Sequence, residues 1–184
     1  MIKTFTISGK TEKEFRLVEI GPEHVEQYLD FMHQVSSDSH FMNRYGDEVL
    51  LDAEAVQVER ERIQAINDDD REIRLSVFDG EKIVGNIVVR RISKHRKTAH
   101  RCSIGIGIRK EYHGMGLGTF LMEQAVAFAK EAGYTNMELG VLSDNLPAQG
   151  LYKKMGFIEC GRIPEAFRLD DGTTADEIVM YRKL

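Results

Sequence analysis

The sequence has little proline and little cysteine, and each shortage narrows what the chain can be. Only three prolines occur among 184 residues, and no proline-, glycine- or serine-rich stretch divides the chain. The two cysteines, Cys102 and Cys160, have no metal-ligand spacing. A core of this size needs no disulfide, so we expect two free thiols in a reducing cytoplasm. Residues 1–184 are therefore predicted to form a single domain.

Long apolar runs and an excess of positive charge are also missing. No apolar run approaches the roughly 20 residues that span a bilayer. The first residues, Met1 to Phe5, lack the apolar stretch of a signal peptide. A formal net charge of -5 argues against a nucleic-acid binder, which usually carries a basic face. We therefore expect neither a membrane nor a nucleic acid as partner.

What remains is an alternation of strand-like and helix-like segments. Period-two patterns predict strands at residues 2–8, 15–20, 73–78, 83–92, 99–108, 137–142, 157–162 and 177–184. Turns are predicted at Gly9-Lys10 and at Asp79-Gly80. Helices are predicted from Gly21, over 52–66, 116–132 and 147–154. Antiparallel hairpins followed by a βαβ-like unit indicate a mixed α/β fold.

The most informative segment lies between a predicted strand and the long helix after it. It reads His113-Gly114-Met115-Gly116-Leu117-Gly118, with glycines two residues apart. Glycines at a strand-to-helix turn leave backbone amides uncovered, and these amides join the positive end of the helix dipole. The segment therefore predicts a binding site for an anion such as a diphosphate.

Two familiar phosphate loops do not match this segment. A Walker loop needs Lys-Ser/Thr after its last glycine, whereas Thr119-Phe120 follows Gly118. The dinucleotide fingerprint needs glycines spaced by two and then three residues, whereas these are spaced by two and two. A tight turn without a ligand is the simpler alternative, and three alternating glycines make it the minority interpretation.

The strand before the loop has one face of small residues. Ser103, Gly105 and Gly107 share this face, and Cys102, Ile104, Ile106 and Ile108 share the other. A face of small residues allows another extended chain to lie close. Close packing of a helix over the glycines is the alternative.

A second motif follows the long helix and carries a family resemblance. It has the form Asn-x-x-Ala-x-x-Leu-Tyr-x-x-x-Gly-Phe, with Asn145, Ala148, Leu151, Tyr152, Gly156 and Phe157 in place. Together the two motifs resemble the GNAT superfamily of N-acetyltransferases, over about residues 99 to 160. The family loop reads Gln/Arg-x-x-Gly-x-Gly/Ala, so Gly116 and Gly118 match and His113 departs from it. Because that loop works mainly through backbone amides, the departure changes little.

The resemblance implies a fold and an activity. The fold would be a single GNAT-like domain of the α/β (α+β) class, with a twisted, mostly antiparallel mixed sheet of about seven strands and about four flanking helices. The activity would be direct transfer of an acetyl group from acetyl-CoA, a co-substrate, to a primary amine of a small molecule or peptide, without a metal. The alternative is a catalytically silent acyl-CoA-binding or sensing module on the same fold.

The resemblance also implies roles for individual residues. The pantetheine arm would pair with the backbone of residues 106–108, and a backbone N–H near Ile108 would polarise the thioester carbonyl. Tyr152 would be the general acid for the leaving thiolate, because a phenol with a pKa of about 10 can supply that proton. Asn145 would hold the co-substrate or order the following turn. Residues implied to bind the co-substrate are Ile106, Gly107, Ile108, His113, Gly114, Met115, Gly116, Leu117, Gly118, Thr119, Asn145 and Tyr152.

The general base that deprotonates the amine stays open. Glu138 and Asp144 are candidates, although a solvated surface carboxylate is the favoured interpretation of each. His100 is a further candidate, although a lone histidine near a strand start is usually structural. His95 lies in a basic turn and is expected to be exposed to solvent.

The acceptor loop and the assembly are predicted only in outline. Phe41, Met42 and Arg44 lie between the first two helices, where the family often places the acceptor, and a loop anchored by its hydrophobic residues is the equal alternative. Asp47 or Glu48 could instead attract a cationic polyamine. A homodimer is a common assembly for such folds. A nucleotide-binding regulatory domain is a third interpretation, which the missing Walker lysine disfavours.

Overall fold

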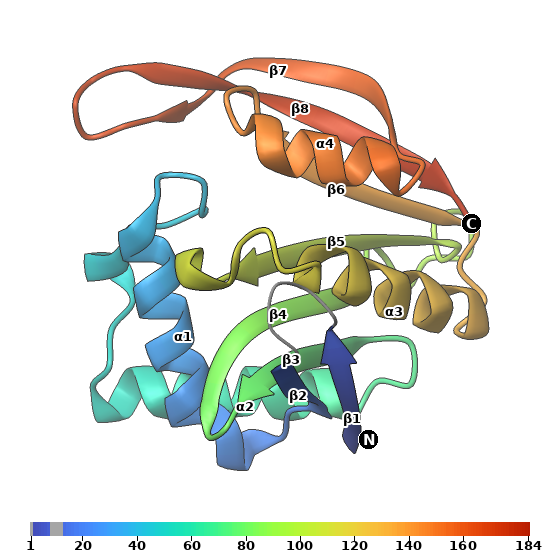
Figure 1. The fold of residues 1–184 in the computed structure, drawn as a ribbon. Helices are drawn as coiled ribbons and strands as arrows, with labels where there is room; N and C mark the ends of the chain where they lie inside the picture. Colours follow the sequence, from blue (N-terminus) through green and yellow to red (C-terminus); the bar gives the residue numbers. More distant parts are fainter. Residues whose placement is uncertain (1, 8–12) are drawn as a thin grey trace.

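A twisted eight-stranded sheet organises the computed structural model, which describes residues 2–7 and 13–184 (Figure 1). The strand order is β1-β2-β3-β4-β5-β6-β8-β7, and all neighbours are antiparallel except β5 and β6. The strands are β1 (Ile2–Ile7), β2 (Lys13–Glu19), β3 (Ile73–Asp79), β4 (Lys82–Arg91), β5 (Arg101–Ile108), β6 (Asn136–Leu142), β7 (Ile158–Arg168) and β8 (Thr174–Lys183). The helices are α1 (Val25–Asp38), α2 (Ala53–Asn67), α3 (Leu117–Glu131) and α4 (Leu146–Lys154), with 3-10 turns η1 (Pro22–His24), η2 (Gly46–Glu48) and η3 (Lys110–Tyr112).

This architecture confirms the predicted mixed, mostly antiparallel sheet, with the eight strands that the period-two patterns predict where the family resemblance implied about seven. The turn predicted at Gly9-Lys10 lies outside the described residues. The last two strands are longer than predicted, because β7 and β8 extend into an arm around the turn between Leu169 and Thr173. The arm residues of β7 are nearly all exposed. A strand without a buried face lacks the alternating apolar pattern that would reveal it in the sequence.

Two hydrophobic clusters hold the helices against opposite faces of the sheet. Neighbouring strand residues enter different clusters: Leu17 and Val77 pack beneath α3, whereas Val18 and Phe78 pack beneath α1 and α2. Because successive strand side chains point to opposite faces, α3 and the α1–α2 pair cover different sides. The α3 residues buried in the first cluster are Leu117, Leu121, Met122, Ala125, Val126 and Ala129.

The parallel pair β5 and β6 is joined at one end only. Residues 101–103 of β5 pair with residues 136–138 of β6, and no register continues beyond Ser103 and Glu138. β6 stays paired with β8 along its whole length, so β6 leaves together with β8 and α4. In Figure 1 these elements lie above β5 and meet it near the C-terminus. We call the opening beyond Ser103 and Glu138 the β5–β6 gap.

A buried arginine fixes the free end of β5. Arg109 is only 3% exposed and donates from Nε to the Ile83 carbonyl at 2.8 Å. Its Nη2 donates to Asp30 of α1 at 2.5 Å, and its guanidinium lies 5.9 Å from the ring centre of Phe31. These contacts tie the end of β5 to β4 and α1. The backbone just before Arg109 is therefore held in place where β5 borders the gap.

Candidate functional site

The edge of β5 that faces the gap carries backbone groups without a partner strand. The N–H of Arg109 donates to the Val84 carbonyl at 2.9 Å, in register with the β4–β5 pairing. Since bonding direction alternates along an antiparallel strand, the odd-numbered residues of β5 bond to β4. The N–H and C=O groups of Ile106 and Ile108 therefore point into the gap. A ligand with amide groups can pair with them as an added strand.

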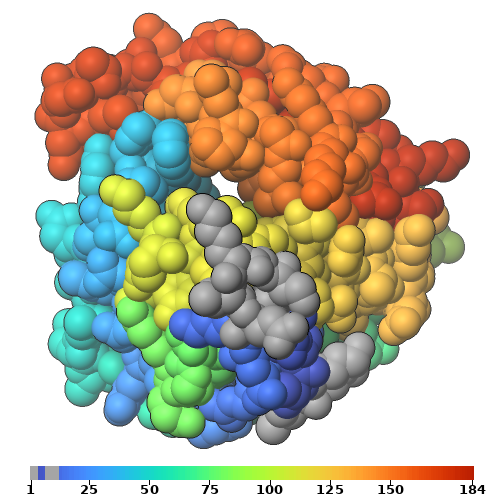
Figure 2. All heavy atoms as spheres, viewed as in Figure 1, coloured from blue at the N-terminus to red at the C-terminus, as the bar shows by residue number. Residues whose placement is uncertain are grey.

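The surface is hollowed at this place. Figure 2 shows an opening between the orange segment that carries α4 and the yellow segment that holds the end of β5 and the following loop.

The glycine loop presents backbone amides at the start of α3. Gly114 and Gly116 have φ values of 75° and 87°, a conformation that glycine adopts readily and other residues rarely do. Gly116 is the N-cap and offers no side-chain cap, and the first turn of α3 contains no acidic residue. The N–H groups of residues 117–119 have no partner within the helix. The predicted anion site therefore has the required geometry.

The third glycine of the loop allows a close approach of three elements. A Cβ on Gly118 would lie 3.0 Å from Leu151 Cδ2 and 3.4 Å from Ile108 Cδ1. The start of α3 thus touches α4 and the end of β5 at once. This contact brings the glycine loop, the second motif and the gap-facing backbone together, although they are far apart in the sequence.

His113 ties the loop to the end of β5. Its Nε2 lies 2.9 Å from the Ile108 carbonyl oxygen, and because a carbonyl can only accept, Nε2 is the donor. This carbonyl is one of the groups that point into the gap. The histidine that replaces the usual Gln or Arg therefore has a local structural role in orienting the loop.

Tyr152 lies on α4 with a buried ring and an unpaired hydroxyl. The residue is 7% exposed, and its ring centre lies 6.1 Å from that of Phe157. Among the described residues, none forms a recorded hydrogen bond with the Tyr152 hydroxyl. Burial raises the pKa of Tyr152 to about 12, so the phenol keeps its proton at neutral pH. The site therefore holds a protonated donor.

Asn145 shapes the start of α4. Its Oδ1 accepts a hydrogen bond from the Ala148 N–H at 3.2 Å and so caps the helix. Gln149 donates from its side-chain amide to the carbonyls of Leu142 and Ser143, at 3.2 Å and 3.0 Å. α4 is therefore anchored to the end of β6, and Asn145 orders the turn as one of its two predicted roles.

Two of the three predicted acceptor residues lie near the free end of β5. A Cβ on Gly107 would lie 3.4 Å from Phe31 Cζ and 3.8 Å from Met42 Cε. The ring centres of Phe41 and His40 lie 4.3 Å apart with the rings tilted, and His40 Nε2 lies 2.7 Å from Asp144 Oδ2. The loop after α1 thus reaches from β5 to the start of α4. This places Phe41 and Met42 on the α1 side of the sheet, at the rim of the gap.

Arg44 is not brought together with them. It lines a separate hollow of about 360 Å³ between α1, η2 and α2, together with Leu29, Glu48 and Glu59. Its surroundings contain both acids and bases. The structure therefore separates the predicted arginine from the predicted aromatic residue.

The base candidates from the sequence are engaged or distant. Glu138 accepts two bonds of 2.6 Å from Arg101, and Asp144 is paired with His40. His95 and His100 precede β5, so at about 3.3 Å per residue His100 lies roughly 26 Å along the strand from Ile108. None of these groups is a free base beside the end of β5.

Glu177 was not singled out by any sequence motif. It pairs with Leu142 across β6 and β8, and its carboxylate occupies the space where a Cβ on Gly140 would lie. Within the described ranges, no hydrogen bond or ion pair to the Glu177 carboxylate is recorded. The available signal was Gly140, because a glycine inside a strand often marks a close approach.

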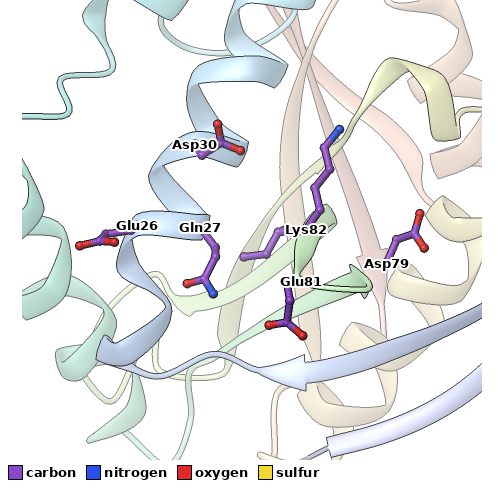
Figure 3. Close-up of a pocket in the computed structure, with 7 residues that line it drawn as sticks. Glu26, Gln27, Asp30, Asp79, Glu81 and Lys82 are labelled. Carbon is purple, nitrogen blue, oxygen red and sulfur yellow. The ribbon is translucent and has the colours of Figure 1, made fainter.

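A larger hollow lies elsewhere on the molecule. It measures about 520 Å³, and Figure 3 shows side chains from α1 and from the β3–β4 turn around it. Three of its acids already have partners: Asp30 pairs with Arg109, Asp79 with Lys13 and Glu81 with Arg16. This hollow contains neither the glycine loop nor the second motif. Its lining residues are Glu26, Gln27, Asp30, Asp79, Glu81, Lys82 and Ile83.

The described residues contain neither a metal-binding cluster nor a membrane-spanning helix. In residues 2–7 and 13–184, no group of three or more His, Cys, Asp or Glu side chains is arranged to hold a metal ion. No helix in those same ranges is long and apolar enough to cross a membrane. Cys102 is buried and Cys160 exposed, and both are free thiols.

Comparison with known proteins identifies relatives of the chain. The sequence model described as the acetyltransferase (GNAT) family matches residues 29–157. A Bacillus subtilis protein, provisionally named ribosomal protein bS18-alanine N-acetyltransferase, is 40% identical over 76 residues. That match covers 41% of this chain and about half of the relative's length, 48%.

Solved structures share the fold over nearly the whole chain. An acetyltransferase of the GNAT family from Streptococcus pneumoniae superimposes with a TM-score of 0.83 at 25% identity, covering 92% of this chain and 99% of that one. A provisionally named acetyltransferase from Salmonella typhimurium, solved with its cofactor acetyl-CoA, has a TM-score of 0.79 at 14% identity. It covers 92% of this chain and 94% of its own.

Proposed function

The chain belongs to the GNAT family of acetyltransferases, and from that premise we propose that it transfers an acetyl group from acetyl-CoA directly to a primary amine. The observation that carries the proposal is the β5–β6 gap. Its edge presents the backbone of Ile106 and Ile108 without a partner strand and leads into the glycine loop. The acceptor would be a small molecule or a peptide.

The described residues fit acetyl-CoA as a co-substrate. The backbone of residues 106–108 would hold the pantetheine amides, and the loop from His113 to Thr119 would hold the diphosphate through its N–H groups. The absence of an acid in the first turn of α3 supports this, since a carboxylate there would repel the phosphates. The co-substrate supplies a thioester, which is the activated acyl donor.

Two groups of the chain would act on the reacting atoms. The N–H of Ile108 points into the gap and would stabilise negative charge on the carbonyl oxygen as it develops. Tyr152 would donate its proton toward the departing sulfur, because its phenol stays protonated far above neutral pH. Its unpaired hydroxyl has no competing acceptor among the described residues.

Two observations bear on the class of amine that accepts the acetyl group. The Bacillus subtilis relative is named for an alanine of a ribosomal protein, which supports a peptide amine as one class. The loop carrying Phe41 and Met42 at the rim of the gap supports an acceptor that approaches from the α1 side. A panel that includes small amines and short peptides separates the two classes.

Location and assembly complete the proposal. Two free thiols are compatible with a reducing cytoplasm, where we place the protein. A homodimer is supported by β7, an edge strand of the sheet on which Ile158 and Ile163 are 63% and 49% exposed. Sedimentation of the purified chain measures the assembly directly, and a monomer at all concentrations would remove the dimer from the proposal.

The decisive experiment measures thiol release from acetyl-CoA across an amine panel. Polyamines, aminoglycosides, amino acids and short peptides represent the acceptor classes. Release with one class, together with the acetylated product in the mass spectrum, supports the proposal. Binding of acetyl-CoA without release from any class would favour a silent acyl-CoA-binding module. An absence of binding would contradict the proposal altogether.

A further inference from the structure

Three carboxylates lie on or beside the face of the sheet that borders the gap on the α1 side. Glu138 is held by Arg101 through two bonds of 2.6 Å, and Asp144 is held by His40 at 2.7 Å. Glu177 differs, because no partner for its carboxylate is recorded in the described part of the chain. A group that must exchange a proton with a substrate needs such a free carboxylate.

Extending the β5–β6 pairing past its last pair places Glu177 level with the end of β5. Ser103 pairs with Glu138 in parallel, so counting equal steps along both strands brings Leu142 level with Gly107. Leu142 pairs with Glu177 on β8. By the same count, Glu138 lies four residues farther back, about 13 Å along the strand at 3.3 Å per residue.

The alternation of side chains along each strand shows on which face of the sheet the Glu177 carboxylate lies. Cys102 and Met137 pair and are both buried in the cluster beneath α3. Gly107 and Gly140 therefore belong to the opposite face, where Phe31 of α1 approaches Gly107. The Glu177 carboxylate folds over Gly140 on this face, and Gly140 is exposed. It lies on the α1 side of the sheet, whereas Tyr152 lies in the cluster on the α3 side.

We infer that Glu177 is the general base that takes a proton from the incoming ammonium group of the acceptor, and that Gly140 is a glycine because the carboxylate needs its space. The inference rests on the proposed function. It also narrows the acceptor to an amine that arrives protonated, since a free carboxylate attracts a cation.

The proton and bond changes balance with Glu177 and Tyr152 in these roles. Glu177 accepts one proton from the ammonium group, which frees the nitrogen lone pair. The nitrogen–carbon bond forms and the carbon–sulfur bond breaks, with the bonding pair leaving on sulfur. Tyr152 donates a proton to that sulfur. The nitrogen loses its second proton as the amide forms, and this proton restores the phenol.

Charged groups on the neighbouring elements influence the protonation of the Glu177 carboxylate. On β6, Glu138 is neutralised by Arg101, and on β7, Arg162 is paired with Asp176 at 3.0 Å. The charged or titratable groups on the neighbouring elements are Glu138 on β6, Asp144 with His40 after β6, Arg162 and Glu165 on β7, and Asp176 and Tyr181 on β8.

The test compares Glu177→Gln with the wild type in acetyl-CoA binding and in the pH dependence of kcat/KM. At pH 7 the variant is expected to lose roughly 10²–10⁴-fold in kcat/KM while binding acetyl-CoA normally. The loss should shrink as pH rises toward the amine pKa of about 10, because the acceptor then arrives without its extra proton. Glu159→Gln on the exposed strand β7 is the matched control and should behave as wild type.

A second variant tests the role of Gly140 with Glu177 intact. Gly140→Ala displaces the carboxylate, so it should lower kcat/KM in the same direction, whereas Gly150→Ala, which meets open space, should not. Wild-type rates in Glu177→Gln, or an equal loss at every pH, would overturn the inference and leave the acetyltransferase standing. A wild type that transfers nothing from bound acetyl-CoA would overturn both.

Discussion

The sequence motif identifies Tyr152, whereas the protonation state of its phenol depends on the folded structure. The motif placed it on a short helix, and the structure confirms α4 over residues 146–154. Its burial, which keeps the phenol protonated, depends on packing from other elements. We expect Tyr152→Phe to bind acetyl-CoA as the wild type does and to lose roughly 10²–10⁴-fold in kcat, because the proton donor is missing. Single-turnover kinetics beside equilibrium titration measure the two separately, and an unchanged kcat would remove Tyr152 from the mechanism.

Cys102 predicts how stability responds to alkaline pH. Burial raises the pKa of its thiol from 9.0 to about 12. Below pH 9 the thiol is protonated in both folded and unfolded chains, so its contribution to stability is complete. Between pH 9 and 12 only the unfolded chain loses the proton, and the free energy of unfolding falls as pH rises. Urea unfolding across this range should show a shallower fall in Cys102→Ala than in the wild type. Cys160→Ala, at an exposed site, should keep the wild-type slope.

At the scale of single residues, the sequence did not identify Glu177 as a candidate base. Its importance depends on the pairing of β6 with β8 and on the space above Gly140. Both are long-range features, and their local sign in the sequence was a glycine inside a strand, Gly140. Glu138 and Asp144 were visible as candidates because they lie near the motifs, and only the structure shows Arg101 and His40 beside them.

The start of α3 is the element whose geometry was predicted most fully. Alternating glycines imply positive φ and uncovered amides, and Gly116 has φ of 87°. We expect Gly116→Ala to weaken acetyl-CoA binding, because the strained backbone redirects the amides. Gly133→Ala, with φ of 77° at the other end of α3, is the matched control. Both variants should lose about 1–2 kcal/mol of stability, and only Gly116→Ala should lose binding. Equal acetyl-CoA affinity in the two would show that the loop amides do not hold the co-substrate.

A buried ion pair joins α2 to β3, away from the proposed site. Arg74 Nη1 lies 2.7 Å from Glu59 Oε1, and the two side chains are 1% and 6% exposed. Removing one partner leaves the other charge buried, so Arg74→Met should cost about 3–5 kcal/mol in urea unfolding. Arg62 contacts the same Glu59 from a position that is 60% exposed. Arg62→Met should therefore cost less than about 1 kcal/mol, and a similar cost for both would contradict this account.

At the scale of the whole molecule, local patterns predicted the helices and strands but not the divergence of β5 from β6. Period-two segments and caps predicted the helices and most strands, including the Asp52 cap of α2, which accepts from the Ala55 N–H at 2.8 Å. β6 diverges from β5 while it stays paired with β8, a strand that begins 32 residues after the end of β6 (174 − 142). Strand length in the β7–β8 arm was underestimated, because exposed polar strands carry no apolar alternation.

We propose above that acetyl-CoA lies in the β5–β6 gap, where it pairs with the free edge of β5 and contacts the start of α3. Amide NMR of the isotope-labelled chain, with and without acetyl-CoA, tests it most directly. We expect changed amide chemical shifts and slowed hydrogen exchange at Ile106, Ile108 and residues 116–119. Amides around the hollow lined by Glu26 and Asp79 should change little. Unchanged amides in β5 and the glycine loop at saturating acetyl-CoA would contradict it.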